Sequence, residues 1–240
     1  MPRLYLFAEG QTEQTFADAL LKPHLANFGV YLHRPVLIAH ARKKGRVHRG
    51  GGRKYEPLKN DIVRFLKQEK SGDVYFTTMI DLYRLHAGFP GKDEADKLRH
   101  FPQRRVRELE ESWAEDIGDK RFIPFIQLHE YEAYLFVDVT RLGLFYLNAD
   151  ARIGRLSEIS AAFKTPELID DGDDTAPSKR IIGEFPEYEG GKTTVGPQVA
   201  EAVGLPEIRK KCPHFAEWLT QLEGLGGDSN VASPESRRAG

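Results

Sequence analysis

The chain opens with an apolar run that stops abruptly at an acid and a glycine, and this opening limits the fold more than any other stretch. Residues 4–8 read Leu-Tyr-Leu-Phe-Ala, and Glu9 and Gly10 follow directly. Such a run is typical of a strand that is buried on both faces of a sheet. After it, Gly10 permits a tight turn, Thr12 can act as a helix cap, and apolar residues recur at helical spacing up to Leu25. The opening therefore predicts a strand, a turn and a helix.

Two later apolar runs also end in acidic residues. They cover residues 73–80 and 121–128, and acids follow each of them at once or within a few positions. In an open parallel sheet the carboxyl ends of the strands share one edge, and ligands bind at that edge. The alternative for each acid is structural, because a carboxylate can simply end a strand or stabilise the N-terminus of a helix. The acids expected at this shared edge are Glu9, Glu13, Asp81, Glu130 and Glu132.

The remaining pattern divides the chain into a core, an extension and a tail. Residues 30–39 predict a further strand, with Pro35 marking its entry or an edge position. From about residue 140 the sequence pattern changes to short helical segments separated by Gly, Pro and acidic turns. We therefore expect an α/β core over 1–139, a mainly helical extension over 140–226 and a disordered tail over 227–240.

The composition excludes several classes of protein. A single cysteine, Cys212, excludes an internal disulfide framework and a cysteine-rich zinc site, and it is typical of a reducing cytoplasm. No apolar run approaches the roughly 20 residues that a membrane-spanning helix needs, so we expect a cytoplasmic protein without a membrane partner. Residues 189–193 imitate the end of a nucleotide-binding loop, but Pro186 occupies the place of its first glycine, so no ATP site is expected.

Residues 42–54 concentrate positive charge. Seven of these thirteen residues are Lys or Arg, and four are Gly. Glycine at this density predicts a mobile loop, and the like charges repel one another unless an anion neutralises them. The segment therefore predicts contact with nucleic-acid phosphates, and a solvated loop is the alternative. The candidate phosphate-binding residues are Arg42, Lys43, Lys44, Arg46, Arg49, Arg53 and Lys54.

These motifs resemble a known superfamily. Glu9-Gly10 after the first strand, Glu13 beyond it and Asp81 after a later strand resemble the Toprim fold of topoisomerases, primases and overcoming-lysogenization-defect nucleases. Residues 1–226, including the segments 129–133 and 176–180, are similar to a bacterial family placed in that superfamily, domain of unknown function 4276. The resemblance implies a Toprim or Rossmann-like, mostly parallel sheet flanked by helices.

The resemblance also implies roles for the acids. In Toprim proteins the glutamate after the first strand is a general acid or base and later aspartates hold magnesium, which makes Glu9 and Asp81 catalytic and Mg²⁺ (or Mn²⁺) the cofactor. In the related nucleases the second glutamate also contacts metal, which implies the same for Glu13. One departure is that Tyr83 replaces the second aspartate of the usual D-x-D motif. We expect Glu130 or Glu132 to supply the missing ligand.

The expected function is that of a metal-dependent nuclease acting in bacterial anti-phage defence. The resemblance implies an ATPase partner of the ABC or structural-maintenance type, because such nucleases are often fused to or paired with one. We expect docking on the C-terminal half, with exposed aromatic residues Tyr131, Tyr134, Phe185 and Tyr188. Two alternatives remain, namely a catalytically silent binding or regulatory subunit, which Tyr83 favours, and a small-nucleotide phosphotransferase that uses the same edge.

Overall fold

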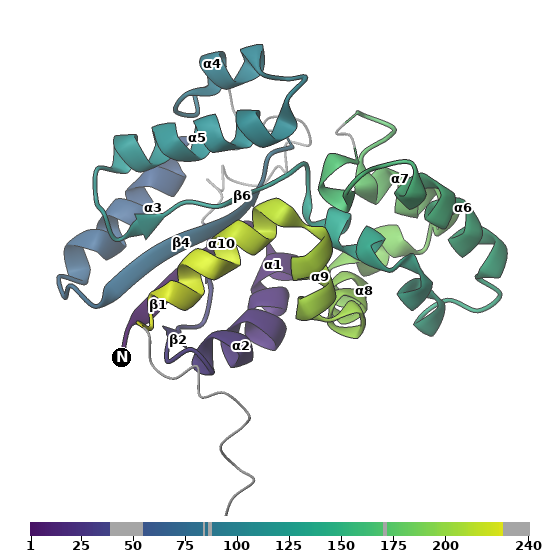
Figure 1. The fold of residues 1–240 in the computed structure, drawn as a ribbon, viewed down its shortest axis with the longest axis horizontal. Coiled ribbons are helices and arrows are strands. Elements are labelled where there is room, and N and C mark those ends of the chain that lie inside the picture. Colours follow the sequence, from purple (N-terminus) through teal and green to yellow (C-terminus); the bar gives the residue numbers. More distant parts are fainter. Residues whose placement is uncertain (39–54, 84, 86–87, 170–171, 228–240) are drawn as a thin grey trace, which may run out of the picture.

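The computed structural model describes residues 1–38, 55–83, 85, 88–169 and 172–227. Within these residues, six strands form one parallel sheet flanked by helices (Figure 1). The two long strands, β1 (Arg3–Ala8) and β4 (Val74–Asp81), lie side by side in its centre. The predicted α/β class with a mostly parallel sheet is thereby confirmed.

The outer strands are short and interrupted by proline. Beside β1 lie β2 (Tyr31–Leu32) and β3 (Val36–Leu37), separated at Pro35, and beside β4 lie β5 (Phe122–Ile123) and β6 (Ile126–Gln127), separated at Pro124. Proline has no N–H to donate to a neighbouring strand, so it is tolerated at the edges of a sheet and not in its centre. The strand predicted at 30–39 therefore exists as two short edge pieces.

Each face of the sheet is covered by its own helices. Phe7, Phe76 and Ile126 face a cluster that includes Ile62 and the fully buried Trp113. Leu4, Leu6 and Ala8, which alternate with Phe7 along β1, face the other cluster. The first face is covered by α3 (Tyr55–Gln68), α4 (Lys92–Lys97) and α5 (Pro102–Ile117), and the second by α1 (Gln11–Phe16), a π-helical turn (Ala17–Leu21), α2 (Lys22–Ala26) and α10 (Pro213–Gly224).

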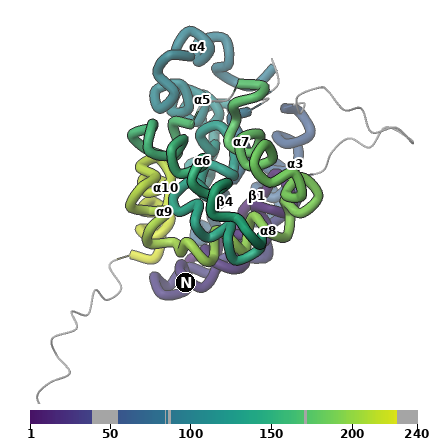
Figure 2. Tube along the Cα trace, turned by 90° about the vertical axis from the view of Figure 1, so that its right-hand side faces the viewer, coloured from purple at the N-terminus to yellow at the C-terminus, as the bar shows by residue number. Residues whose placement is uncertain are grey.

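The helical C-terminal part lies largely beyond the carboxyl ends of the strands. Turned by 90°, the molecule shows α6, α7 and α8 in front of β1 and β4 (Figure 2). The elements of this part are η2 (Tyr131–Val137), η3 (Val139–Leu144), α6 (Asp150–Ala161), η4 (Pro166–Leu168), α7 (Pro177–Glu184), α8 (Tyr188–Val203) and α9 (Leu205–Lys211). One hydrophobic cluster joins Leu6 of β1 to Val199 of α8 and Phe215 of α10, so the extension completes the core on one face of the sheet.

Two local expectations are wrong. Helix α1 begins at Gln11 and Gly10 precedes it, so Thr12 is not the cap. The four aromatic residues expected on a docking surface are instead buried, because they fill the space between the sheet and the extension. Tyr131, Tyr134, Phe185 and Tyr188 are each at most 2% exposed.

Two of the expected segments lie wholly or largely outside the described residues, and the described helices bear on the membrane expectation. The basic segment 42–54 and residues 228–240 of the expected tail lie outside the described residues. Among the residues that are described, no helix combines the length and apolarity needed to cross a membrane.

Candidate metal centre

The parallel pairing of β1 and β4 places Glu9 beside Asp81. Ala8 is in register with Met79, and the N–H of Glu9 donates to the carbonyl oxygen of Met79 over 3.0 Å. Two residues beyond Met79, the N–H of Asp81 donates to Oε2 of Glu9 over 2.8 Å. The two acids therefore lie at the same edge of the sheet, as their positions at the ends of two strands predicted.

Asp81 is also linked to the third strand. Its Oδ1 accepts hydrogen bonds from Nε2 of Gln127 at 2.8 Å and from the N–H of Tyr131 at 3.1 Å. Gln127 lies directly opposite Asp81 in the pairing of β6 with β4. In the described part of the chain, no donor is bonded to Oδ2 of Asp81. One oxygen is thus fixed by the protein and the other is available to a ligand.

Glu13 is folded back over the turn that follows β1. Its side chain is only 5% exposed, and its Oε2 accepts a hydrogen bond from the N–H of Gly10 at 2.8 Å. This contact satisfies a free N–H at the start of α1, so the capping alternative describes part of its role. Burial first, and then the charges of Glu9 and Glu132, raise the pKa of Glu13 to about 7.

Glu130 and Glu132 have different surroundings. Both oxygens of Glu130 accept hydrogen bonds from Ser178, one from its N–H and one from its Oγ at 3.1 Å, and this ties the first turn of α7 to the end of β6. Glu132 is 7% exposed and lies 3.5 Å from Nζ of Lys192. Burial, followed by the charge of Glu130, raises the pKa of Glu132 to about 7 against the opposing effect of Lys192. Glu132 is therefore the better candidate ligand of the two.

These five carboxyl groups form one electrostatic unit, which we call the acidic cluster (Glu9, Glu13, Asp81, Glu130 and Glu132). Burial raises the pKa of Asp81 well above its usual range, and the charges of the other four acids raise it further. Buried carboxylates that repel one another are stabilised by a cation, and hard oxygen donors are the ligands that Mg²⁺ prefers. The chemistry of the donor set therefore fits a divalent cation.

The acidic cluster is not arranged around a preformed coordination point. Among the residues that the structure describes, no three His, Cys, Asp or Glu side chains are grouped so that they could hold a metal ion as they stand. The reason is visible in the contacts above, since each carboxylate is turned toward a donor from the protein. Cation binding would therefore require side chains such as those of Glu13 and Glu132 to rotate toward Asp81.

Tyr83 does not substitute for an acid. Its N–H donates to the carbonyl oxygen of His129 over 2.8 Å, and its hydroxyl is 3.4 Å from Oδ1 of Asp173. His129 itself has a φ of 65°, a left-handed conformation that is uncommon for a residue with a side chain. This turn directs the chain from β6 into Glu130 and η2.

Three polar residues at the acidic cluster were not predicted as site residues. They are Gln127, Ser178 and Lys192, which contact Asp81, Glu130 and Glu132 respectively. The only sequence signal was for Gln127, a polar residue near the end of the third apolar run, 121–128. The residues from α7 and α8 depend on long-range packing that leaves no local pattern.

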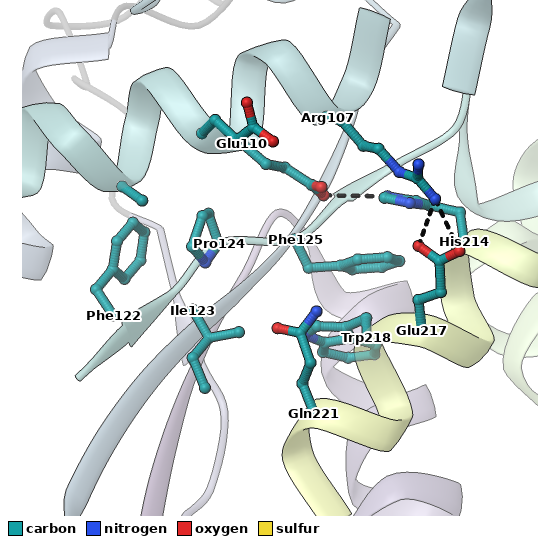
Figure 3. Close-up of a pocket in the computed structure, with 12 residues that line it drawn as sticks. Arg107, Glu110, Phe122, Ile123, Pro124, Phe125, His214, Glu217, Trp218 and Gln221 are labelled. Carbon is teal, nitrogen blue, oxygen red and sulfur yellow. Dashed lines mark hydrogen bonds and ion pairs between the residues drawn. The ribbon is translucent and has the colours of Figure 1, made fainter. Parts of the chain in front are cut away.

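A separate cleft of about 350 Å³ lies between α5, β5 and α10 (Figure 3). No member of the acidic cluster lines it. Two ion pairs lie at this cleft, Arg107 with Glu217 and Glu110 with His214. We therefore assign the candidate site by the convergence of acids at the sheet edge and not by the volume of a cleft.

One comparison with known proteins identifies a family. The sequence model of a family described as "Domain of unknown function (DUF4276)" matches residues 8–223. Neither the curated proteins nor the solved structures include a match to the chain.

Proposed function

The chain belongs to the DUF4276 family, and we propose that it is a metal-dependent phosphodiesterase that cleaves nucleic acid at the acidic cluster. The observation that carries this proposal is the convergence of acids at one edge of the sheet. Oε2 of Glu9 accepts the N–H of Asp81, Asp81 contacts Gln127 of the third strand, and the charges of Glu13, Glu130 and Glu132 raise the pKa of Asp81. A structural core gains nothing from several buried carboxylates that repel one another, whereas a cation site needs them.

The chemistry divides among the residues as follows. Asp81, Glu13 and Glu132 would hold Mg²⁺ or Mn²⁺ through carboxylate oxygens that receive no donor within the described residues. When bound, the ion would supply an activated water and offset the negative charge that builds on the phosphate. Glu9, which accepts the N–H of Asp81, would move a proton as general acid or base.

The finer parts of the proposal rest on sequence resemblance. The Toprim relationship, the role in anti-phage defence and the partnership with an ATPase of the ABC or structural-maintenance type follow from the similarity of the acidic motifs to Toprim nucleases. DNA or RNA as substrate is supported by the basic segment 42–54, whose charge suits a phosphate backbone.

The test is a cleavage assay on plasmid DNA and on single-stranded RNA with Mg²⁺ or Mn²⁺. Glu9→Gln keeps an oxygen that can accept the N–H of Asp81 but cannot move a proton, so it should abolish cleavage without lowering the unfolding midpoint. The exposed Glu201 on α8 provides a matched control, Glu201→Gln, which should cleave like the wild type. Full activity of Glu9→Gln would assign the chemistry elsewhere.

A second candidate function is a catalytically silent binding or regulatory subunit. It is favoured by Tyr83 in the place of an acid and by the protein donors that already bond to one oxygen of Glu13 and to both oxygens of Glu130. If wild-type protein cleaves neither substrate and binds neither ion, this second function replaces the first.

A further inference from the structure

Gln127 presents an unusual combination of contacts at the acidic cluster. Its side chain is 1% exposed, and its amide nitrogen donates to Oδ1 of Asp81 at 2.8 Å. Its amide oxygen, Oε1, is fully buried and has no hydrogen-bond partner among the described residues. A buried acceptor without a donor is costly, and an apolar side chain of similar shape would avoid that cost. The oxygen therefore calls for a partner beyond the described residues.

The orientation of this amide is fixed by its neighbours. Oδ1 of Asp81 also accepts the N–H of Tyr131 at 3.1 Å, which identifies this oxygen as an acceptor. Turning the amide over would place Oε1 of Gln127 against that acceptor, and two oxygens without a proton between them repel. Nε2 of Gln127 must therefore face Asp81, and Oε1 is left at the acidic cluster without a donor.

We propose that Gln127 is part of the cation site, where Oε1 is a neutral oxygen donor to a divalent cation held by Asp81. This inference rests on the proposed function and adds a ligand to it. Amide oxygens of Asn and Gln are ordinary ligands of hard cations. Gln127 also lies directly across from Asp81 in the sheet, so it offers an oxygen next to the acid. A neutral donor adds no further charge to acids that already repel one another.

The test measures cation affinity and not catalysis. Mn²⁺ is titrated calorimetrically into the full-length wild type, Gln127→Met and Gln127→Glu, each freed of metal with a chelator. Gln127→Met removes both polar atoms at nearly constant volume, and it should weaken Mn²⁺ binding at least tenfold. Gln127→Glu keeps an oxygen donor but loses the N–H to Asp81, so it should bind Mn²⁺ as tightly as the wild type or more tightly.

Gln14→Met is the matched control, because the amide of Gln14 also donates over 2.9 Å, but to the backbone oxygen of Pro35. It should bind Mn²⁺ like the wild type, and without the ion its unfolding midpoint should be comparable with that of Gln127→Met.

If Gln127→Met binds within twofold of the wild type, or if the Met and Glu variants lose affinity equally, Oε1 is not a donor and the inference is overturned while the cation site stands. If the wild type itself binds no Mn²⁺, both the inference and the proposed function fail.

Discussion

At the scale of single residues, Glu13 shows the conflict between folding and a cation site most clearly. Its carboxyl group is buried beside Glu9 and Glu132, and these surroundings raise its pKa to about 7. The pKa of Glu13 is higher in the folded state than the unfolded value of about 4.5. The contribution of Glu13 to the stability of the fold is therefore complete at low pH. Stability is then lost as the pH rises through the window from about 4.5 to 7, because the ionised group is less well accommodated in the folded state.

Glu13→Gln should therefore stabilise the metal-free protein at pH 8. We expect a gain of roughly 1–3 kcal/mol there and little change at pH 4.5, since each pKa unit corresponds to about 1.4 kcal/mol and neighbouring acids share the shift. Urea unfolding in the presence of a chelator measures the difference. Glu201→Gln should show no such pH-dependent gain, and a lower stability of Glu13→Gln at pH 8 would contradict the account.

The sequence alone allowed the acids to be placed, because a strand that ends in a carboxylate is a local pattern. Glu9 and Asp81 lie at one edge since parallel strands end together, and this geometry does not depend on any particular packing. Ser178 and Lys192 could not be predicted as site residues, because they reach the acids from α7 and α8, which lie far along the chain. The buried docking aromatics were misplaced for the same reason.

At the scale of elements, α10 is joined to the edge of the sheet through His214. Its Nε2 lies 3.0 Å from Oε1 of Glu110 in α5 (Figure 3). The same nitrogen lies 3.1 Å from the carbonyl oxygen of Ile126 in β6. Both neighbours are acceptors, so Nε2 carries a proton and donates it. Burial alone would lower the pKa of His214, but the hydrogen bond and charge of Glu110, the charge of Glu167 and the Ile126 carbonyl outweigh it and raise the pKa.

This contact predicts a pH-dependent attachment of α10. Because the folded pKa of His214 is raised, its contribution is complete below the unfolded value of about 6.5 and is lost as the pH rises through the folded value. His214→Gln should cost roughly 1–3 kcal/mol at pH 6, as for hydrogen bonds to charged groups, and should lose less stability than the wild type between pH 6 and 8.5. The exposed His100 gives the control His100→Gln. An unchanged pH slope in His214→Gln would assign the attachment to apolar packing alone.

The prolines of the edge strands illustrate what can be predicted at this scale. Pro35 marks an edge because proline cannot donate to a neighbouring strand, and the structure places it between β2 and β3. The packing of α10 across the sheet could not be derived, because its apolar residues indicate only that the helix is buried and not which surface covers it.

At the scale of the whole molecule, the proposal requires a polyanion to reach the acidic edge despite its negative charge. The basic segment 42–54 is the expected means, although it lies outside the described residues.

If about four of its side chains contact phosphates, duplex affinity should fall with salt at a log–log slope of about −3.6, from about −0.9 per contact. Replacing Arg42, Lys43, Lys44 and Arg46 by Ala should flatten that slope and weaken binding equally for all sequences, because phosphate contacts carry no base information. An unchanged slope in filter-binding titrations would make the segment a solvated loop.

The central claim is that the acidic cluster holds a divalent cation, and anomalous diffraction tests it most directly. Crystals of the wild-type protein are soaked in Mn²⁺, and data are collected at the manganese absorption edge. We expect an anomalous peak beside Oδ2 of Asp81, with the carboxylate of Glu13 or Glu132 turned toward it and away from Gly10 or Lys192. A map without a peak at this edge of the sheet, in which Glu13 still accepts the N–H of Gly10 and Glu132 still contacts Lys192, would contradict the claim.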